Sequence, residues 1–207
     1  MRALDEVVAS GRARFVGVSN FTGAMMAECM KTRRIDVIQV GYHMLDRRQE
    51  TETFPACLEH GIGVMGYGSL AHGLLTGAFT PATTFEAGRD WRAGGVAFGQ
   101  PIFRGANLAA NVAVVERLRR EIAEPHGVSV SQLALAWVLA NPAVSTALVG
   151  ARTPAEVDAN DAGAELTLSP EERAKIEAIL AGVAGRVREF TPLRPAMEPW
   201  GAELSAR

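Results

Sequence analysis

Polar and aromatic side chains follow the apolar, β-rich runs of this sequence, at the point where each run ends. Ser19 and Asn20 end the first run. Gln39 lies near the end of the second run, and Tyr67 ends the third. Since the carboxyl ends of parallel strands meet at one rim of a sheet, we expect these side chains to lie together there. Hydroxyl and amide groups beside an aromatic face could bind an amide-bearing ring and stack it on Tyr67.

The fourth run ends in Gly150-Ala151-Arg152, which combines small residues with a cation. Thr153 follows and is expected to cap a helix that extends to about Ala162. Free backbone N–H groups and the helix dipole attract anions at such an N-terminus, and Arg152 would add positive charge. The pattern therefore indicates a phosphate site on the same rim.

Each of these side chains also has a purely structural interpretation. Ser19 and Asn20 could cap the helix that follows them, and Gln39 could pair with backbone inside a buried layer. Tyr67 could lie in the core with its hydroxyl bonded, and Arg152 could be a solvated surface residue. Their shared position at strand ends favours the binding interpretation. No Gly-x-Gly-x-x-Gly motif follows the first run, so a Rossmann-type site lacks its main support.

Strands and helices alternate along the chain. The expected strands are apolar runs at residues 14–20, 36–42, 62–67 and 144–149. Apolar residues spaced three and four positions apart indicate the helices. These lie over residues 4–8, 50–60, 107–124 and 153–162, and three more begin at Thr22, Ser129 and Ser169. Residues 69–106 are rich in Gly, Pro, Thr and Ala and are typical of a long irregular loop.

This alternation predicts an α/β fold with a parallel sheet that helices cover on both faces. Two architectures fit four β/α units. One is a doubly wound open sheet, and the other is half of a (β/α)8 barrel, which has about 250 residues when whole. Residues 186–207 show no clear periodicity and are expected to form a C-terminal tail.

Composition restricts the class of protein and its partners. Of 207 residues, 48% are hydrophobic and 21% charged, which is typical of a globular protein. A formal net charge of -2 provides no basic field for nucleic acid, and no apolar run is long enough to span a membrane. Cys29 and Cys57 match no metal or disulfide spacing and fit buried positions in a reducing cytosol. Met1 opens onto charged residues without a signal peptide, so a cytoplasmic location is expected.

Five stretches resemble, in order, the signature motifs of the aldo-keto reductases. They are Gly11–Phe21, Gln39–His43, Gly66–Gly77, Gln132–Trp137 and Gly150–Asn160. The resemblance implies a (β/α)8 TIM barrel that reduces aldehydes or ketones with NAD(P)H. Within that barrel, residues 1–185 would form the C-terminal half, with about four C-terminal β/α units (strands 5–8) and a C-terminal helix.

The resemblance also implies which residues hold the cofactor, with NADP expected and NAD as the alternative. Ser19, Asn20 and Gln39 match the positions that hold the nicotinamide carboxamide, and Tyr67 matches the position that stacks on the ring. The stretch that covers the pyrophosphate includes Gly68, Leu70 and Gly73. The positions around the adenosine and its 2′-phosphate correspond to Gly150, Ala151, Arg152, Glu156 and Asn160.

Glu156 departs from the family pattern, in which Gln or Arg is frequent at this position. A carboxylate repels a phosphate unless Arg152 screens it. We therefore expect mixed or NAD-leaning cofactor use.

The family's catalytic groups find no counterpart in this chain. The resemblance implies a proton-donating Tyr tuned by a Lys and an Asp, with a His beside the carbonyl, all from strands that precede the first run. The only lysines are Lys31 and Lys175, and the only tyrosines are Tyr42 and Tyr67. Both lysines lie in expected helices, away from the strand ends. Tyr42 belongs to the Gln39–His43 motif, and Tyr67 matches the ring-stacking position. Hydride transfer to a carbonyl needs a positioned acid, so no catalytic residue is predicted, and enzymatic activity of the chain alone is left open.

Three functions remain compatible with these observations. The first is a truncated NAD(P)H-dependent reductase, which would act on a small carbonyl substrate once an N-terminal half completes it. The second is a non-catalytic nucleotide-binding or interaction module. The third is half of a split barrel, in which exposed sheet edges and an open apolar layer would favour self-association.

Overall fold

Four parallel strands form the centre of the computed structural model, which describes residues 1–187. The predicted tail at residues 186–207 therefore lies almost wholly outside the described part of the chain. The strands are β1 (Gly17–Ser19), β2 (Val37–Gly41), β3 (Gly63–Tyr67) and β4 (Val144–Ala147). They pair in the order β1-β2-β3-β4, and all three pairings are parallel. The predicted α/β class with a parallel sheet is confirmed.

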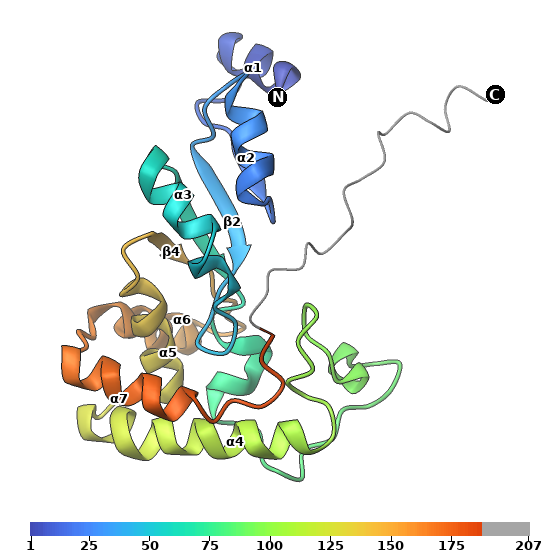
Figure 1. The fold of residues 1–207 in the computed structure, drawn as a ribbon. Coiled ribbons are helices and arrows are strands. Elements are labelled where there is room, and N and C mark those ends of the chain that lie inside the picture. The colour runs from blue at the N-terminus through green and yellow to red at the C-terminus, as the bar shows by residue number, and fades with distance from the viewer. Residues whose placement is uncertain (188–207) are drawn as a thin grey trace.

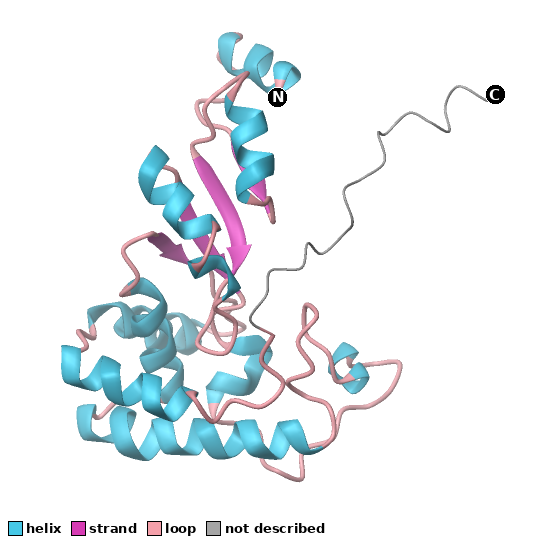
Figure 2. Cartoon of the chain, viewed as in Figure 1, coloured by secondary structure: helices cyan, strands magenta, loops and turns pink. Residues whose placement is uncertain are grey.

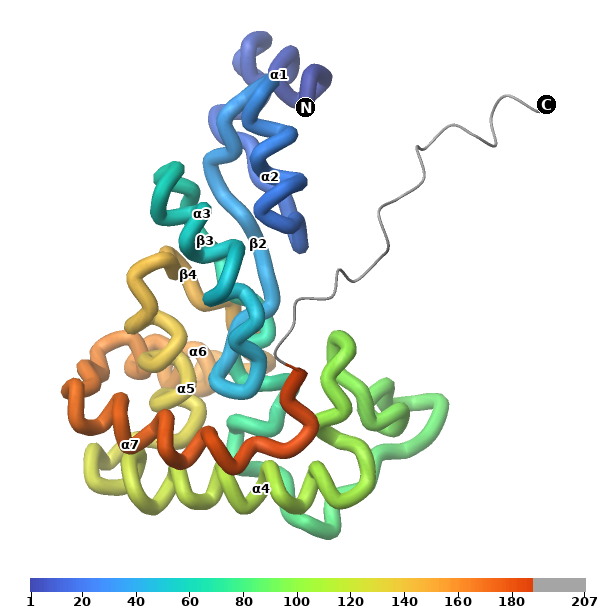
Figure 3. Tube along the Cα trace, viewed as in Figure 1, coloured from blue at the N-terminus to red at the C-terminus, as the bar shows by residue number. Residues whose placement is uncertain are grey.

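Seven α-helices accompany the sheet within the described residues. They are α1 (Arg2–Ala9), α2 (Gly23–Met30), α3 (Thr53–His60), α4 (Ala106–Leu118), α5 (Val130–Leu139), α6 (Pro154–Asp161) and α7 (Pro170–Leu180). Helices α1 and α2 lie at one end of the molecule, beside β1, whereas α4 and α7 lie side by side at the other end (Figure 1). The tube view shows the same arrangement (Figure 3).

The strand order distinguishes between the two architectures that fit the sequence. A doubly wound sheet contains a point at which the strand order reverses. Among the described strands the order is consecutive, without such a reversal, as it is in a (β/α)8 barrel.

One face of the sheet is more open than the sequence indicated. Ile38, Val40 and Val64 are fully buried, whereas the alternate positions of β2 and β3 are only half-buried. The expectation that both faces are covered is therefore wrong for this chain, because side chains alternate between the faces and helices bury only one of them. In Figure 2, β2 points toward the loops that lie between the sheet and the helices α4 and α7.

Two element boundaries differ from the predicted ones for identifiable reasons. The first strand is shorter than residues 14–20, because the backbone N–H of Val16 donates to Asp36 Oδ2 at 2.8 Å and Asn20 turns to φ +57°. The third helix begins at Thr53 rather than at residue 50. Pro55 then lies in the first turn of the helix. Backbone N–H groups there have no acceptor within the helix, so a proline, which lacks the N–H, costs no hydrogen bond.

The predicted helix starts are confirmed by side-chain caps. Thr22, Ser129, Thr153 and Ser169 each accept a backbone N–H from the first turn of the helix that follows. The predicted helix at residues 107–124 is α4, and its last part widens into a π-turn at Arg119–Ala123.

The long segment at residues 69–106 is less irregular than expected. It contains two 3-10 helices, η2 (Ala71–Thr76) and η3 (Trp91–Gly94). The Arg92 guanidinium lies 5.4 Å from the centre of the Phe79 ring and 5.0 Å from that of Phe85, and it is paired with Asp90. Such cation–π and aromatic contacts stabilise the segment, and Phe79 and Phe85 also pack against the main hydrophobic core.

The two cysteines differ in their surroundings. Cys57 is buried as predicted, whereas Cys29 is only partly buried. Neither forms a disulfide.

We predict that Gly163→Ala destabilises the fold by about 2 kcal/mol, because a buried site without free space tolerates added atoms poorly. A Cβ at Gly163 would lie 3.0 Å from Gln132 Cα and 3.1 Å from Gln132 O on α5. Gly94 has open space around it, so Gly94→Ala is the matched control, with an expected change within about 0.5 kcal/mol. Urea denaturation measures both variants, and equal free energies of unfolding would contradict the prediction.

Candidate nicotinamide-binding site

A row of side chains crosses the half-buried face of the sheet, one from each strand. Ser19 pairs with Gln39, and Gln39 pairs with Met65. Met65 in turn pairs with Thr146 after a bulge in β3–β4. Partners in register point to the same face, so Ser19 and Gln39 are brought together as predicted.

Tyr67 lies across the neighbouring strand at the carboxyl end of this face. A Cβ at Gly41 of β2 would be 3.4 Å from the Cε2, Cζ and Oη atoms of Tyr67, so the tyrosine ring lies directly against this position of β2. The Tyr67 hydroxyl donates to Asn20 Oδ1 at 3.0 Å, beyond the end of β1. Burial is the main reason that the pKa of Tyr67 is raised. The phenol therefore stays neutral and acts as the donor in this bond.

Ser19 and Asn20 do not cap the following helix, because Thr22 does. Ser19 Oγ donates to the Gln39 carbonyl oxygen at 3.1 Å, and the Asn20 backbone N–H donates to the same oxygen at 2.9 Å. The side-chain amide of Gln39 has no hydrogen-bond partner among residues 1–187. A half-buried amide that lacks a partner beside a flat aromatic ring fits a ligand that carries its own amide.

The loop after β3 contains Gly68, Leu70 and Gly73, and Gly68 lines a pocket together with Tyr67. Its backbone is left-handed at Gly68 and Gly73 and also at two residues between them, Ala71 and His72. A Cβ at Gly73 would lie 3.1 Å from the Phe79 ring and 3.2 Å from Arg92 Nη1. The loop therefore follows a tightly turned path in which Gly73 leaves little room for a larger side chain.

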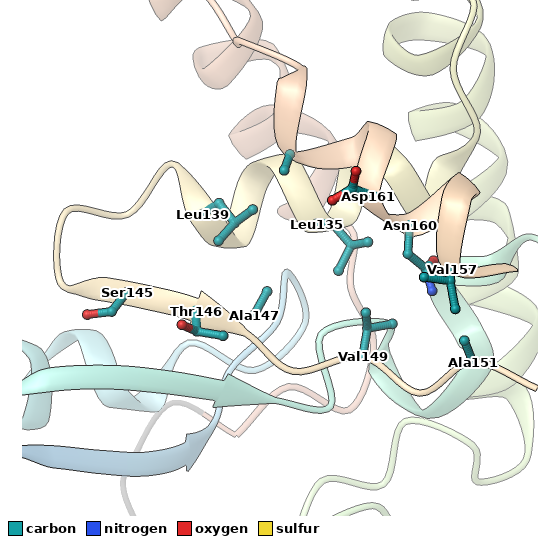
Figure 4. Close-up of a pocket in the computed structure, with 11 residues that line it drawn as sticks. Leu135, Leu139, Ser145, Thr146, Ala147, Val149, Ala151, Val157, Asn160 and Asp161 are labelled. Atoms are coloured by element: carbon teal, nitrogen blue, oxygen red, sulfur yellow. The ribbon is translucent and has the colours of Figure 1, made fainter. Parts of the chain in front are cut away.

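A second pocket, of about 370 Å³, lies between β4, α5 and α6 and contains two of the predicted adenosine-end residues (Figure 4). Ala151 and Asn160 line it together with apolar side chains that include Val149 and Val157. Gly150 is not among its lining residues and has open space around it. The structure thus divides the predicted site residues into one group at the Tyr67 ring and another near the start of α6.

Arg152 and Glu156 form an exposed ion pair rather than a free cationic site. The Glu156 carboxylate accepts the backbone N–H of Arg152 at 2.6 Å and the Arg152 Nη2 at 3.0 Å. Both hydrogen bonds lower the pKa of Glu156, and the bond from the Arg152 backbone has the larger effect. A negative charge of the chain itself therefore occupies the position at α6 where the sequence indicated a phosphate, and part of the Arg152 charge is neutralised.

Sequence reasoning missed a buried ion pair behind the rim. Asp46 and Arg48 are both less than 10% exposed and are joined by Arg48 Nη2 at 2.6 Å from Asp46 Oδ2. Burial alone would raise the pKa of Asp46, yet the hydrogen bonds and charge of Arg48, together with the neighbouring His43, lower it overall. Arg48 Nη2 also donates to the Phe98 carbonyl oxygen at 2.9 Å. The pair therefore ties the loop after β2 to the long segment after β3.

His43 precedes this pair and is held as a neutral imidazole. Its Nδ1 accepts the backbone N–H groups of Leu45 and Asp46 at 3.2 and 3.1 Å. Burial lowers the pKa of His43 to about 3. One sequence feature could have indicated this arrangement. His43 and Asp46 lie three residues apart, directly after an apolar strand.

The tyrosines and lysines have partners away from any shared reaction centre. Tyr42 donates to Glu50 Oε1 at 2.6 Å, and burial raises its pKa. Lys31 pairs with Glu28, and Lys175 pairs with Glu121. No tyrosine–lysine pair is therefore found in the described part of the chain.

Among residues 1–187, no helix is long and apolar enough to cross a bilayer. The same residues contain no group of three or more His, Cys, Asp or Glu side chains placed to hold a metal ion.

The chain belongs to the aldo/keto reductase family, whose model matches residues 1–181. Aldo-keto reductase YhdN of Bacillus subtilis is 33% identical over 177 residues, which cover 86% of this chain and 52% of that protein. The NADH-specific methylglyoxal reductase of Escherichia coli is 31% identical over 166 residues, with 80% and 48% covered. A glycerol dehydrogenase structure from Gluconobacter oxydans matches with a TM-score of 0.81 at 30% identity, over 91% of this chain and 55% of that one.

The chain spans about half the length of these relatives. Members of the family are oxidoreductases that use nicotinamide cofactors and bind carbonyl substrates. The expected family is confirmed, and the four-stranded parallel sheet matches a solved member of it.

We predict that Arg48→Met lowers the free energy of unfolding by about 3 kcal/mol, because it leaves the Asp46 carboxylate buried without its cation. Adding Asp46→Asn to the same chain removes the uncompensated charge and should restore most of the loss. Urea denaturation of the two single variants and the double variant gives the coupling between the residues. A loss below about 1 kcal/mol for Arg48→Met would show that the pair is not a support of the fold.

Proposed function

We propose that this chain provides the cofactor-binding platform of an NAD(P)H-dependent aldo-keto reductase. The observation that supports this most directly is the Tyr67 ring over Gly41, bonded to Asn20 and flanked by the unbonded amide of Gln39. Tyr67 would stack on the nicotinamide, and Gln39 would hold the carboxamide together with Ser19 and Asn20. When bound, a reduced nicotinamide supplies the hydride that converts a carbonyl to an alcohol.

The remaining predicted residues would hold the rest of the dinucleotide. Gly68, Leu70 and Gly73 would cover the pyrophosphate with backbone. The adenosine end would lie near α6, against Gly150, Ala151, Arg152, Glu156 and Asn160, two of which line the apolar pocket beside β4.

We further propose that residues 1–185 correspond to strands 5–8 of the barrel and its final helix. The consecutive order of four parallel strands and the coverage of about half of each relative support this assignment. Self-association through the edges of β1 and β4 stays a prediction. A cytoplasmic location fits the two free cysteines.

The proton that the carbonyl oxygen takes up during reduction needs a separate acid. Because Tyr42, Tyr67 and both lysines have other partners, we assign this role to no residue of the chain. No contact within residues 1–187 favours the alternative of a non-catalytic interaction module.

A calorimetric titration of the chain with NADH tests the proposed cofactor-binding platform. Tyr67→Leu should weaken binding about tenfold through loss of stacking, whereas Tyr67→Phe keeps the ring and should stay within about threefold of the original chain. Gln39→Leu should also weaken binding, by about tenfold. Absence of NADH binding to the unaltered chain, or equal affinities for Tyr67→Leu and Tyr67→Phe, would refute the proposal.

Glu156 should set the preference between the two cofactors. We propose that the chain prefers NADH, because the Glu156 carboxylate repels a 2′-phosphate and already engages Arg152. Glu156→Gln should improve NADPH affinity about tenfold and leave NADH affinity nearly unchanged. Glu171→Gln, in the first turn of α7, is the matched control and should alter neither. A chain that binds NADPH more tightly than NADH would contradict this preference.

A further inference from the structure

The side chain of His72 connects three segments that are separate in the sequence. The centre of its ring lies 5.1 Å from that of Phe98, in a stacked arrangement, and 5.2 Å from that of Trp91, edge to face. The ring of His43, in the loop after β2, approaches it edge to face at 5.7 Å. One imidazole therefore joins the loop after β3, the loop after β2 and the tip of the long segment, which we define as residues 91–98.

The groups around His72 offer its ring no free counter-charge. Among residues 1–187, the ring nitrogens form no hydrogen bond or ion pair, and only the His72 carbonyl oxygen is bonded, to Arg92 Nη1 at 2.9 Å. The carboxylate of Asp46 is already paired with Arg48, and that of Asp90 with Arg92. A protonated ring at this place would be largely withdrawn from water without a partner, which costs free energy.

The charge state of His72 is therefore linked to its contacts. Burial lowers the pKa of His72 below its ordinary value of 6.5, the charge of Asp46 opposes this effect, and Arg92 adds to it. His43 faces the ring as a neutral group, because burial lowers its pKa to about 3. Contacts that lower the pKa of a histidine are favoured while the ring is neutral, and their contribution is lost as the pH falls through the lowered pKa. The contacts of His72 are thus expected to weaken below pH 6.5 and to persist above it.

The tip is held less firmly than the stretches on either side of it. Trp91 and Phe98 are 55% and 41% exposed, whereas Phe79, Phe85 and Phe103 lie in or against the main hydrophobic core. The φ of Phe98 is +47°, which L-residues other than glycine, asparagine and aspartate rarely adopt. The short helix η3 lies at the outer edge of the molecule, with loops on both sides (Figure 2). Exposed side chains on a strained backbone are the features of a region that opens locally.

We propose that His72 is a pH-sensitive tie, which holds the tip against the loops after β2 and β3 while its ring is neutral and loosens the tip when the ring is protonated. Because the Phe98 ring lies 5.7 Å from the Tyr67 ring, a loosened tip uncovers one side of Tyr67. Arg48 still donates to the Phe98 carbonyl oxygen, so the opening is local and the fold persists. All of these groups belong to the chain itself, and the inference is therefore independent of the cofactor-binding platform.

Hydrogen exchange of the tip, followed by mass spectrometry at pH 7.5 and pH 5.0, tests the tie. After correction for the intrinsic exchange rate at each pH, the amides of residues 91–98 should exchange about fivefold faster at pH 5.0 in the unaltered chain. His72→Phe keeps a ring for the stack but has no group that titrates, so its two corrected rates should agree within about twofold. A response of the same size in His72→Phe, or equal rates in the unaltered chain, would overturn the proposal.

Two controls separate a local opening from a general effect of acid. His60→Gln alters an exposed histidine at the end of α3 and should leave the pH response of the tip unaltered. Peptides from α5, which is buried over most of its length, should show no acceleration at pH 5.0. Acceleration of α5 to the same extent as the tip would mean that the whole fold opens in acid, and the proposed local tie would be wrong.

Proton NMR titration of the His72 ring gives a second measurement, which needs only the unaltered chain. We expect a pKa below the ordinary value of 6.5, and Phe98→Ala, which removes the stacked ring, should move that pKa toward 6.5. A His72 pKa at or above 6.5 would show that the attraction between a protonated ring and Phe98 dominates, and it would refute the tie. Neither measurement uses NADH, so failure of the tie and failure of the cofactor-binding platform are distinguishable.

Discussion

In-register pairing of parallel strands is the constraint on which the candidate site depends. It brings Ser19, Gln39 and Met65 into one row, although they lie far apart in the sequence. It also sets Gly41 beside Tyr67, so that the tyrosine ring can cross β2 and reach Asn20. A shift of one residue in the β2–β3 pairing would move Tyr67 to the helix-covered face and leave a side chain where the ring now lies.

Two ion pairs at the rim differ in what they contribute, because they differ in exposure. Asp46 and Arg48 are buried and satisfy additional hydrogen bonds, so they hold two loops in one arrangement. Arg152 and Glu156 are in solvent, where water and salt screen the attraction. The exposed pair therefore adds little to stability and acts mainly through the local charge that a ligand would meet.

Much of the fold could be predicted from local patterns. The four strands follow from apolar runs, and the helix starts at Thr22, Ser129 and Ser169 follow from side chains that accept first-turn N–H groups. The shorter first strand could not be predicted, because its ladder is interrupted by Asp36, twenty residues further along the chain. Nor could the openness of one sheet face, since an apolar run does not reveal whether the second face has a cover.

The grouping of the candidate site residues could be predicted where they lie at strand ends, but not where it depends on distant contacts. Ser19 and Tyr67 end their strands, which the sequence displays, whereas Gln39 is the central residue of β2 and joins Ser19 through the pairing register. The path of residues 77–105 depends on the contacts of Arg92 with the Phe79 and Phe85 rings and on the hydrogen bond from Arg48 to the Phe98 carbonyl oxygen. No periodicity marks contacts of this kind.

The aromatic cluster around Arg92 is continuous with the main hydrophobic core of the molecule. Phe79 and Phe85 pack against that core, and Ile102 and Phe103 of the same long segment belong to it. Because interiors are closely packed, a substitution at one of these side chains is felt both in the long segment and in the core. The segment after β3 and the core beneath it are therefore expected to change together during evolution.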